Sequence, residues 1–226
     1  MIPANATLVG GFGGTGLRSS SLYPKYLPML LAQAGPVKMA IESMKASCNI
    51  DVLGMMDSAV FGLDDAGTGT LVVTLERANR PVLDACATKL TVELDWLAAD
   101  TFAWAIGKPH GSGSVEKRAL AAVDKSSTIW AVGTRTMPLG DGSLKSFSLT
   151  AQVAAKRIEI DAHLVTDRAQ TASAFSTSVT SQIFPLVSFG RFPSLTTVSV
   201  TSAGANVVAT ASLAEDDVLS LLAKLP

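Results

Sequence analysis

The side chains that perform most enzyme chemistry are scarce in this sequence. Its 226 residues include two histidines and two cysteines, and its acidic residues form no dense cluster. The wide spacing of Cys48 and Cys86 matches neither a redox CxxC motif nor a zinc site. We therefore expect no metal ion and no cofactor, and we assign no catalytic residue.

Charged residues are few and widely spread. The 18 Lys and Arg and the 19 Asp and Glu make up 16% of the chain and leave a net charge of −1. The densest basic groups are the pairs at 117–118 and 156–157. Because nucleic-acid binding needs basic residues gathered on one surface, we expect no nucleic-acid partner. The hydrophobic fraction of 48% argues against intrinsic disorder.

Long hydrophobic runs are missing as well. A transmembrane helix needs ~20 mainly apolar residues, and the longest candidate, 27–34, is broken by Pro28 and Gln33. We expect no transmembrane segment. Residues 1–5 have neither the basic nor the apolar region of a signal peptide. Two locations stay open. One is export to the periplasm or cell surface with the leader absent from this sequence, which the Ser, Thr, Ala and Gly content favours; the other is the cytoplasm.

A pattern of two strands and a helix, repeated with two more strands and a helix, occurs twice. It spans about 57–124 and again about 144–225, and each run follows a lead strand, near 7–12 and 128–135. Hairpin connections imply antiparallel pairing, and helices returning to one face give an α+β sandwich. We expect two related ββαββα halves, 1–125 and 126–226, or one continuous domain. The likeness is one of pattern, so duplication is a hypothesis.

The expected elements follow from periodicity and from turn and cap residues. A helical stretch at 20–48 is interrupted by Pro24, Pro28 and Gly35-Pro36, and Ser212 with Glu215 is interpreted as a capping box. The expected strands are 59–63, 70–75, 91–96, 101–106, 145–153, 157–165, 196–200 and 207–212, and the expected helices begin near residues 79, 114, 167 and 212.

A glycine-rich segment directly follows the first strand. Gly11, Gly13 and Gly16 match GxGxxG, a spacing that lets the backbone approach a pyrophosphate at the start of a helix. The context does not fit, because Pro24 and Pro28 interrupt the following helix and no second strand ends in an acidic residue about 20 residues later. A flexible turn is the alternative interpretation.

Three polar side chains share one face of the expected strand at 157–165. They are Glu159, Asp161 and His163, while apolar residues occupy the other face. A carboxylate beside an imidazole is able to do acid–base work or to bind a metal, and the exposed face is also a candidate binding surface. The alternative is an ordinary solvated sheet face.

Aromatic and hydroxyl side chains mark a second candidate surface. Phe184, Phe189 and Phe192 gather around two prolines, in what we interpret as an apolar loop that either closes over the core or lines a binding surface. The preceding run 171–181 carries hydroxyls on nearly every face of an expected helix. That helix is either a sparsely charged surface helix or one that packs against another protein or a lipid-like surface.

The two cysteines allow two interpretations. Cys48 and Cys86 each lie on the apolar side of a helical pattern. They are either two buried thiols that act as small apolar side chains, or one disulfide between the long helical segment and the helix at 80–90.

The start of the chain resembles exported or lipid-anchored proteins of myxobacteria-like bacteria. The similarity rests on the strand-initiating segment 2–9, on Ser21-Leu22-Tyr23, on Cys48-Asn49-Ile50-Asp51 and on a second cysteine, Cys86. The chain departs from that group at Gly13-Gly14, where the group often has Asp. The resemblance implies an exported location and a Cys48–Cys86 disulfide, and it brings no particular activity.

The sequence thus favours a non-enzymatic exported protein that binds through the exposed sheet face or the apolar loop. Its partner is an unidentified protein or an apolar small molecule. The alternatives are a nucleotide-dependent enzyme that uses the loop 11–16 and a structural subunit of an assembly.

Overall fold

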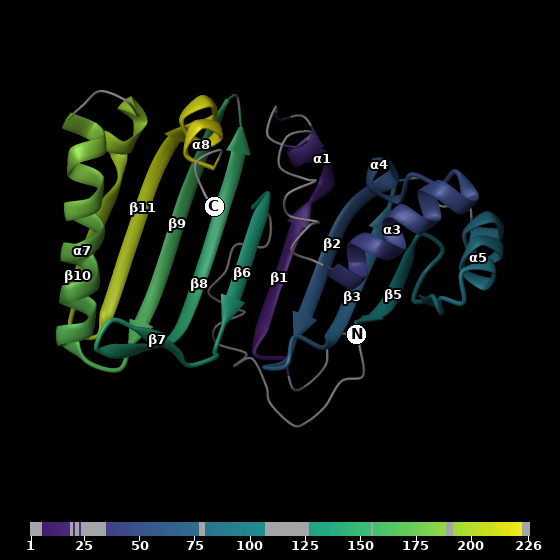
Figure 1. Ribbon diagram of the computed structural model, residues 1–226, viewed down its shortest axis with the longest axis horizontal. Coiled ribbons are helices and arrows are strands. Elements are labelled where there is room, and N and C mark those ends of the chain that lie inside the picture. Colours follow the sequence, from purple (N-terminus) through teal and green to yellow (C-terminus); the bar gives the residue numbers. More distant parts are fainter. Residues whose placement is uncertain are drawn as a thin grey trace. The chain divides into compact units, whose positions relative to one another are not determined.

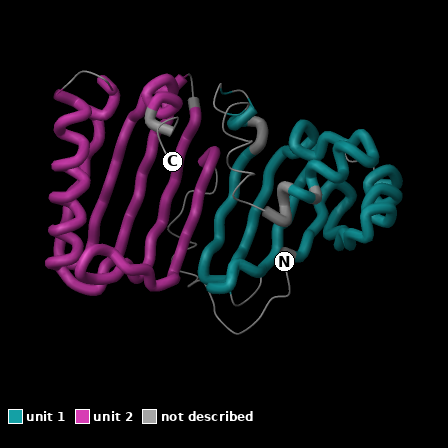
Figure 2. The backbone as a smooth tube through the Cα atoms, in the orientation of Figure 1, with its two compact units in different colours: residues 1–114 teal, residues 115–226 magenta. Residues whose placement is uncertain are grey.

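The computed structural model of the protein describes residues 6–18, 20, 23, 35–76, 80–106, 127–154, 156–188 and 192–222. The chain divides into two compact units, Met1–Ser114 and Val115–Pro226 (Figure 2). The expected boundary at 125–126 and the helix expected from residue 114 lie outside the described residues. Together the units make an α+β protein built on antiparallel strands, as the sequence predicts.

Unit 1 is an antiparallel sheet with helices packed on it (Figure 1). Its strands follow the order β1-β2-β3-β5-β4. Its elements are β1 Leu8–Gly13, α1 Gly14–Arg18, α3 Gly35–Cys48, α4 Val52–Met55, β2 Met56–Leu63, β3 Gly69–Leu75, α5 Arg80–Lys89, β4 Asp95–Trp96 and β5 Thr101–Ile106.

The hairpin of β2 and β3 turns where the sequence predicts, at residues 64–67. The carboxylate of Asp64 accepts hydrogen bonds from the amides of Ala66 and Thr68, both at 2.9 Å, and from the Thr68 hydroxyl at 2.6 Å. Gly67 has φ +77°, a conformation that glycine adopts without strain. A buried carboxylate therefore holds the turn together.

The core of unit 1 lies between its sheet and the helices α3 and α5. Met44 and Leu83 from these helices pack with Val73, Leu75 and Phe102 from the sheet. Cys48 at the end of α3 forms a disulfide with Cys86 of α5, with the two Cα atoms 5.9 Å apart. The disulfide interpretation is thereby confirmed, and the interpretation as two separate thiols is wrong.

Unit 2 has a longer antiparallel sheet in the order β6-β8-β9-β11-β10, with β7 paired to the start of β8. Its elements are β6 Ile129–Gly133, β7 Met137–Leu139, β8 Gly142–Ala154, β9 Arg157–Thr166, α7 Ala169–Ser188, the short 3-10 helix η1 Pro193–Thr197, β10 Ser199–Ala203, β11 Asn206–Ala214 and α8 Glu215–Leu222.

Helix α7 covers both a core and a sheet edge. Its side chains Ile183, Leu186 and Val187 pack onto the cluster formed by Phe192, Leu195 and Leu213. Along its length α7 runs beside β10, the last strand of the order (Figure 1). The Ser176 hydroxyl donates to the Val200 carbonyl at 3.0 Å. A helix beside an edge strand protects its backbone groups from pairing with another chain.

Two expected strands begin later than predicted because the backbone before them takes another conformation. The strand expected at 91–96 is only Asp95–Trp96, since Thr91 takes a left-handed conformation with φ +57°. The strand expected at 196–200 begins at Ser199 because Pro193 starts a 3-10 turn.

Ser212 is not a helix cap. β11 continues to Ala214, and the Ser212 amide donates to the Thr197 hydroxyl while its own hydroxyl donates to Glu159. Cross-strand bonds thus replace the local cap that the sequence favours.

The helices in the described part of the chain include none that is both long and apolar enough to cross a membrane.

Candidate functional site

The polar residues predicted on one strand face do lie together on β9. Glu159, Asp161 and His163 are all exposed, with side chains 56%, 50% and 60% accessible. Residues of β8 and β11 flank them in register, and all of these except Val208 extend the polar face. The rows are Gln152, Glu159 and Ser212; Thr150, Asp161 and Thr210; and Ser148, His163 and Val208.

The side chains of this polar sheet face already bind one another. His163 Nε2 lies 2.9 Å from Asp161 Oδ1. Arg157 Nε and the Ser212 hydroxyl are 3.0 Å apart, and that hydroxyl in turn donates to Glu159. Exposed ion pairs of this kind contribute only about 0–1 kcal/mol to stability. The face is able to offer both signs of charge to a partner, but it is open rather than cleft-like.

The residues that the structure describes contain no group of three or more His, Cys, Asp or Glu placed to hold a metal ion. Asp161 and His163 are a pair, and Glu159 faces Arg157 and Ser212 instead. The polar residues of β9 therefore form two neighbouring groups: the pair of Asp161 and His163, and the hydrogen-bonded group of Arg157, Glu159 and Ser212.

The segment predicted as an apolar loop at 184–193 is helical in its first part and contributes to the core in its last described residues. Helix α7 continues through Pro185 to Ser188, so Phe184 is helical and 71% exposed. Phe192 is 2% exposed and belongs to the core, and Phe189 lies outside the described residues. Proline removes one backbone donor from the helix, and the packing of Ile183, Leu186 and Val187 on the core holds the helix on both sides of Pro185.

The outer surface of α7 is unusual in having no charge. The 20 residues Ala169–Ser188 contain no acidic or basic side chain. Several hydroxyls donate to carbonyls of their own helix: Thr180 to Ser176 at 2.9 Å, Ser181 to Ser178 at 2.8 Å and Ser188 to Phe184 at 2.8 Å. Hydroxyls bonded in this way present less unsatisfied polarity to the outside than their number suggests.

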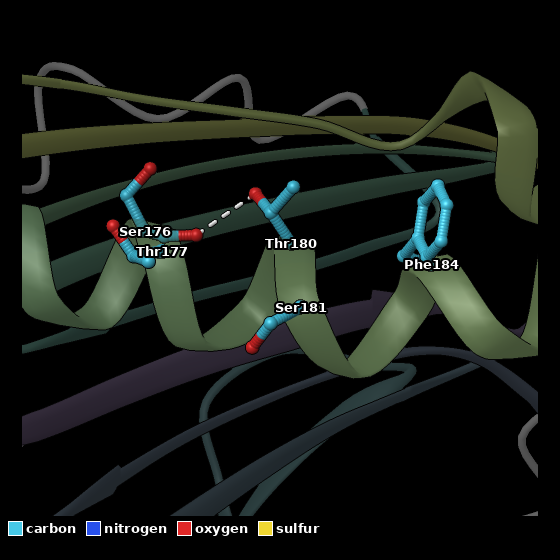
Figure 3. Close-up of a pocket in the computed structure, with 5 residues that line it drawn as sticks. All are labelled: Ser176, Thr177, Thr180, Ser181 and Phe184. Carbon is cyan, nitrogen blue, oxygen red and sulfur yellow. Dashed lines mark hydrogen bonds between the residues drawn. The ribbon is translucent and has the colours of Figure 1, made fainter.

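Five residues of α7 line a shallow depression of about 500 Å³ (Figure 3). They are Ser176, Thr177, Thr180, Ser181 and Phe184. Figure 3 shows the Thr180 hydroxyl turned to the Ser176 carbonyl, with the Phe184 ring standing beside it on the same helix. All lining residues come from one helix, so the depression is a contact surface rather than an enclosed ligand cavity.

The glycine motif does not form a phosphate-binding loop. Gly11 and Gly13 are residues of β1 and pair with Val60 and Ser58 of the antiparallel strand β2. Gly16 lies in α1, a helix of five residues. A dinucleotide site needs a parallel βαβ unit with the glycines in the connection, so the motif falls in the wrong kind of element.

One carboxyl at the start of α7 has a shifted pKa. The hydrogen bond from the Thr171 hydroxyl, at 2.7 Å, and one from the Ser143 backbone lower the pKa of Asp167 below its ordinary value of 3.8. The sequence predicts Asp167 as an N-cap with Gln170 as its return partner. In the structure α7 begins at Ala169, two residues after Asp167, and the side chain of Asp167 accepts its hydrogen bond from Thr171.

Comparison with family models and with curated proteins finds no match. Solved structures of TP0453 are similar in fold. Crystal form III of TP0453 has a TM-score of 0.56 at 8% identity, over 98% of this chain and 96% of that one. Crystal form I has a TM-score of 0.57 at 7% identity, over 97% and 93%. At such low identity the likeness concerns the fold alone.

Proposed function

We propose that the protein is a non-enzymatic, exported binding protein that docks a partner protein on the outer face of α7. The observation that carries this proposal is a surface helix of 20 residues without one charged side chain, on which Phe184 is 71% exposed. Interfaces between proteins are depleted of charged residues at their centre and enriched in aromatic ones, and this helix surface shares both features.

The energetics of α7 favour association. Covering the Phe184 ring contributes about 2 kcal/mol, and no charged group of the helix has to lose its water. The inner side of the helix is fixed, since Ala172 is fully buried and Ile183 packs on the core. A fixed docking face loses little conformational entropy when a partner binds.

The exported location rests on the disulfide between Cys48 and Cys86. Disulfides persist in oxidising compartments such as the periplasm and the cell surface, and they are rare in the cytosol.

Photo-crosslinking in the producing cell tests the proposal. A photoreactive amino acid at Thr177, on α7, should give a discrete adduct with another protein, whereas the same group at Gln152, on the polar sheet face, should not. Phe184→Lys should abolish the adduct, while Val165→Lys, which adds the same charge at an exposed apolar residue of β9, should leave it. Adducts from residue 152 alone would move the binding function to the polar sheet face. If neither position gives an adduct, the proposal of a partner-binding protein is contradicted.

A second candidate, a structural subunit of an assembly, is favoured by the same missing charge. Two copies of α7 meet without like-charge repulsion, so self-association through this helix is the simplest assembly. Light scattering should then give a mass well above 23.4 kDa that Phe184→Lys returns to that of the monomer. A wild-type monomer at micromolar concentration removes this candidate.

We also propose that the two units are related halves. Strand order supports this: β1-β2-β3-β5-β4 in unit 1 corresponds to β6-β8-β9-β11-β10 in unit 2. In each unit a lead strand is followed by a hairpin, a helix and a second hairpin whose last strand pairs with the first hairpin. An experimental structure in which the units do not superpose strand for strand would contradict the relation.

A further inference from the structure

A groove in unit 1 is not part of the surfaces described above. It measures about 830 Å³ and lies among α5, the segment 92–95 and strand β5. Apolar side chains form part of its lining and three carboxylates another part. The lining residues are Thr70, Asp84, Ala87, Thr88, Val92, Glu93, Leu94, Asp95, Ala103 and Ala105.

The charge of the groove has one sign. Asp84, Glu93 and Asp95 line it, and the described lining residues include no Lys or Arg. Asp84 is already bound by the Trp96 indole N–H at 2.6 Å and lies 3.5 Å from Arg80 Nε. Glu93 and Asp95 are exposed, so they are the carboxylates available to an incoming cation.

An open strand edge borders the same groove. β4 pairs with only two residues of β5, Phe102 and Ala103. The Leu97 amide donates to the Thr101 carbonyl at 2.9 Å, so Thr101 turns its backbone toward β4. Backbone groups alternate sides along an antiparallel strand, and those of Ala103 and Ala105 therefore point the same way. In the described part of the chain, no strand pairs with Ala105 on that side.

We propose that this groove binds an extended, basic segment of a partner protein by adding a strand to β5. The peptide backbone pairs with Ala105, as in other cases where a chain extends a sheet edge. Alternate side chains of the peptide then point to the two sides. The cationic side chains of the peptide reach Glu93 and Asp95, and its small apolar side chains lie over Ala103 and Val92. A free polyamine matches the charge but offers no carbonyl to the open edge.

Fluorescence anisotropy with a labelled peptide of alternating Lys and Val tests the proposal on the full chain. We expect saturable binding that weakens by at least about fivefold in Glu93→Gln/Asp95→Asn, because each removes an ion pair. The matched control Asp141→Asn/Asp216→Asn neutralises two exposed carboxylates of unit 2 and should bind as wild type.

Two further ligands separate strand pairing from charge attraction. A peptide with the same side chains but N-methylated at every second residue cannot pair with β5, and it should bind at least about fivefold more weakly, since backbone hydrogen bonds supply much of the affinity. Spermine should not displace the labelled peptide. Equal binding of the methylated peptide, displacement by spermine, or unchanged binding by Glu93→Gln/Asp95→Asn overturns the proposal. None of these variants touches α7, so the result is independent of the function proposed for that helix.

Discussion

At the scale of residues, Asp64 shows how one side chain fixes a turn. It is 8% exposed and accepts three hydrogen bonds from Ala66 and Thr68. The neighbouring Asp65 accepts an exposed hydrogen bond from the Thr7 hydroxyl. Two adjacent aspartates thus differ in what they do for the hairpin of β2 and β3.

We predict that Asp64→Ala lowers the free energy of unfolding by about 2–3 kcal/mol, because it removes the charged acceptor of the Ala66 and Thr68 amides and of the Thr68 hydroxyl. Asp65→Ala, the matched control, should cost about 0.5 kcal/mol. Urea unfolding followed by circular dichroism measures both. Equal losses for the two variants would mean that the buried carboxylate does not hold the turn.

The lowered pKa of Asp167 predicts a pH dependence. Its depressed pKa stabilises the folded state above the ordinary value of 3.8, and this contribution is lost as the pH falls through the lowered pKa. Thr171→Val removes the first cause, so an NMR titration should find the Asp167 pKa closer to 3.8 in that variant. Thr180→Val, which removes a hydroxyl bonded to the helix backbone, should leave the pKa of Asp167 unchanged. A pKa unaffected by Thr171→Val refutes this assignment.

At the scale of elements, the sequence predicts best where the pattern is local and long. The alternation at 157–165 predicts β9 and the shared face of Glu159, Asp161 and His163. Successive side chains of a strand point to opposite faces of the sheet, and this alternation does not depend on what packs against the sheet. Reasoning from clustering fails for Phe184 and Phe192. Clustering in the sequence does not reveal that Phe184 points outward from α7 while Phe192 enters the core, since only the packing of the whole unit decides that.

The sequence shows that α7 carries no charged residue, but it does not show whether the helix docks a partner. The run 171–181 indicates either a sparse surface helix or a docking helix. The structure adds that the inner side is buried at Ala172 and that hydroxyls bond within the helix. These facts make the outer face a defined surface, which no sequence period describes.

The disulfide joins α3 and α5 across a sequence separation of 38 residues. On the chain-entropy model, a loop of this length predicts that Cys48→Ala/Cys86→Ala lowers the free energy of unfolding by about 4 kcal/mol. Reducing agent should lower the melting temperature of the wild type and leave that of the double variant unchanged. Equal sensitivity of both proteins to the reductant would show that the bond does not stabilise the fold.

At the scale of the whole molecule, the fold is shared with TP0453 at very low identity. Folds host unrelated functions, so the fold supplies a scaffold and the surfaces must supply the function. The two units present different surfaces: a charge-free helix and a polar sheet face in unit 2, and a groove with carboxylates in unit 1.

The nucleotide alternative makes a prediction for the whole chain. Because Gly11 and Gly13 are strand residues, we expect NAD and ATP to leave the melting temperature unchanged. Gly13→Val should fold, since a Cβ atom added there meets no atom within 4 Å. A rise in melting temperature that Gly13→Val abolishes would restore the nucleotide-dependent enzyme.

The central claim, that a partner protein covers α7, is tested most directly by thiol labelling. Both native cysteines are in the disulfide, so Ser181→Cys on α7 and Gln152→Cys on the polar sheet face each give a single reactive thiol. Maleimide should label both at similar rates in the purified protein. In the producing cells, labelling of residue 181 should slow by at least about tenfold while that of residue 152 stays fast, because desolvated contact surfaces exclude water-borne reagents. Equal labelling of residue 181 in cells and in the purified protein would contradict the claim.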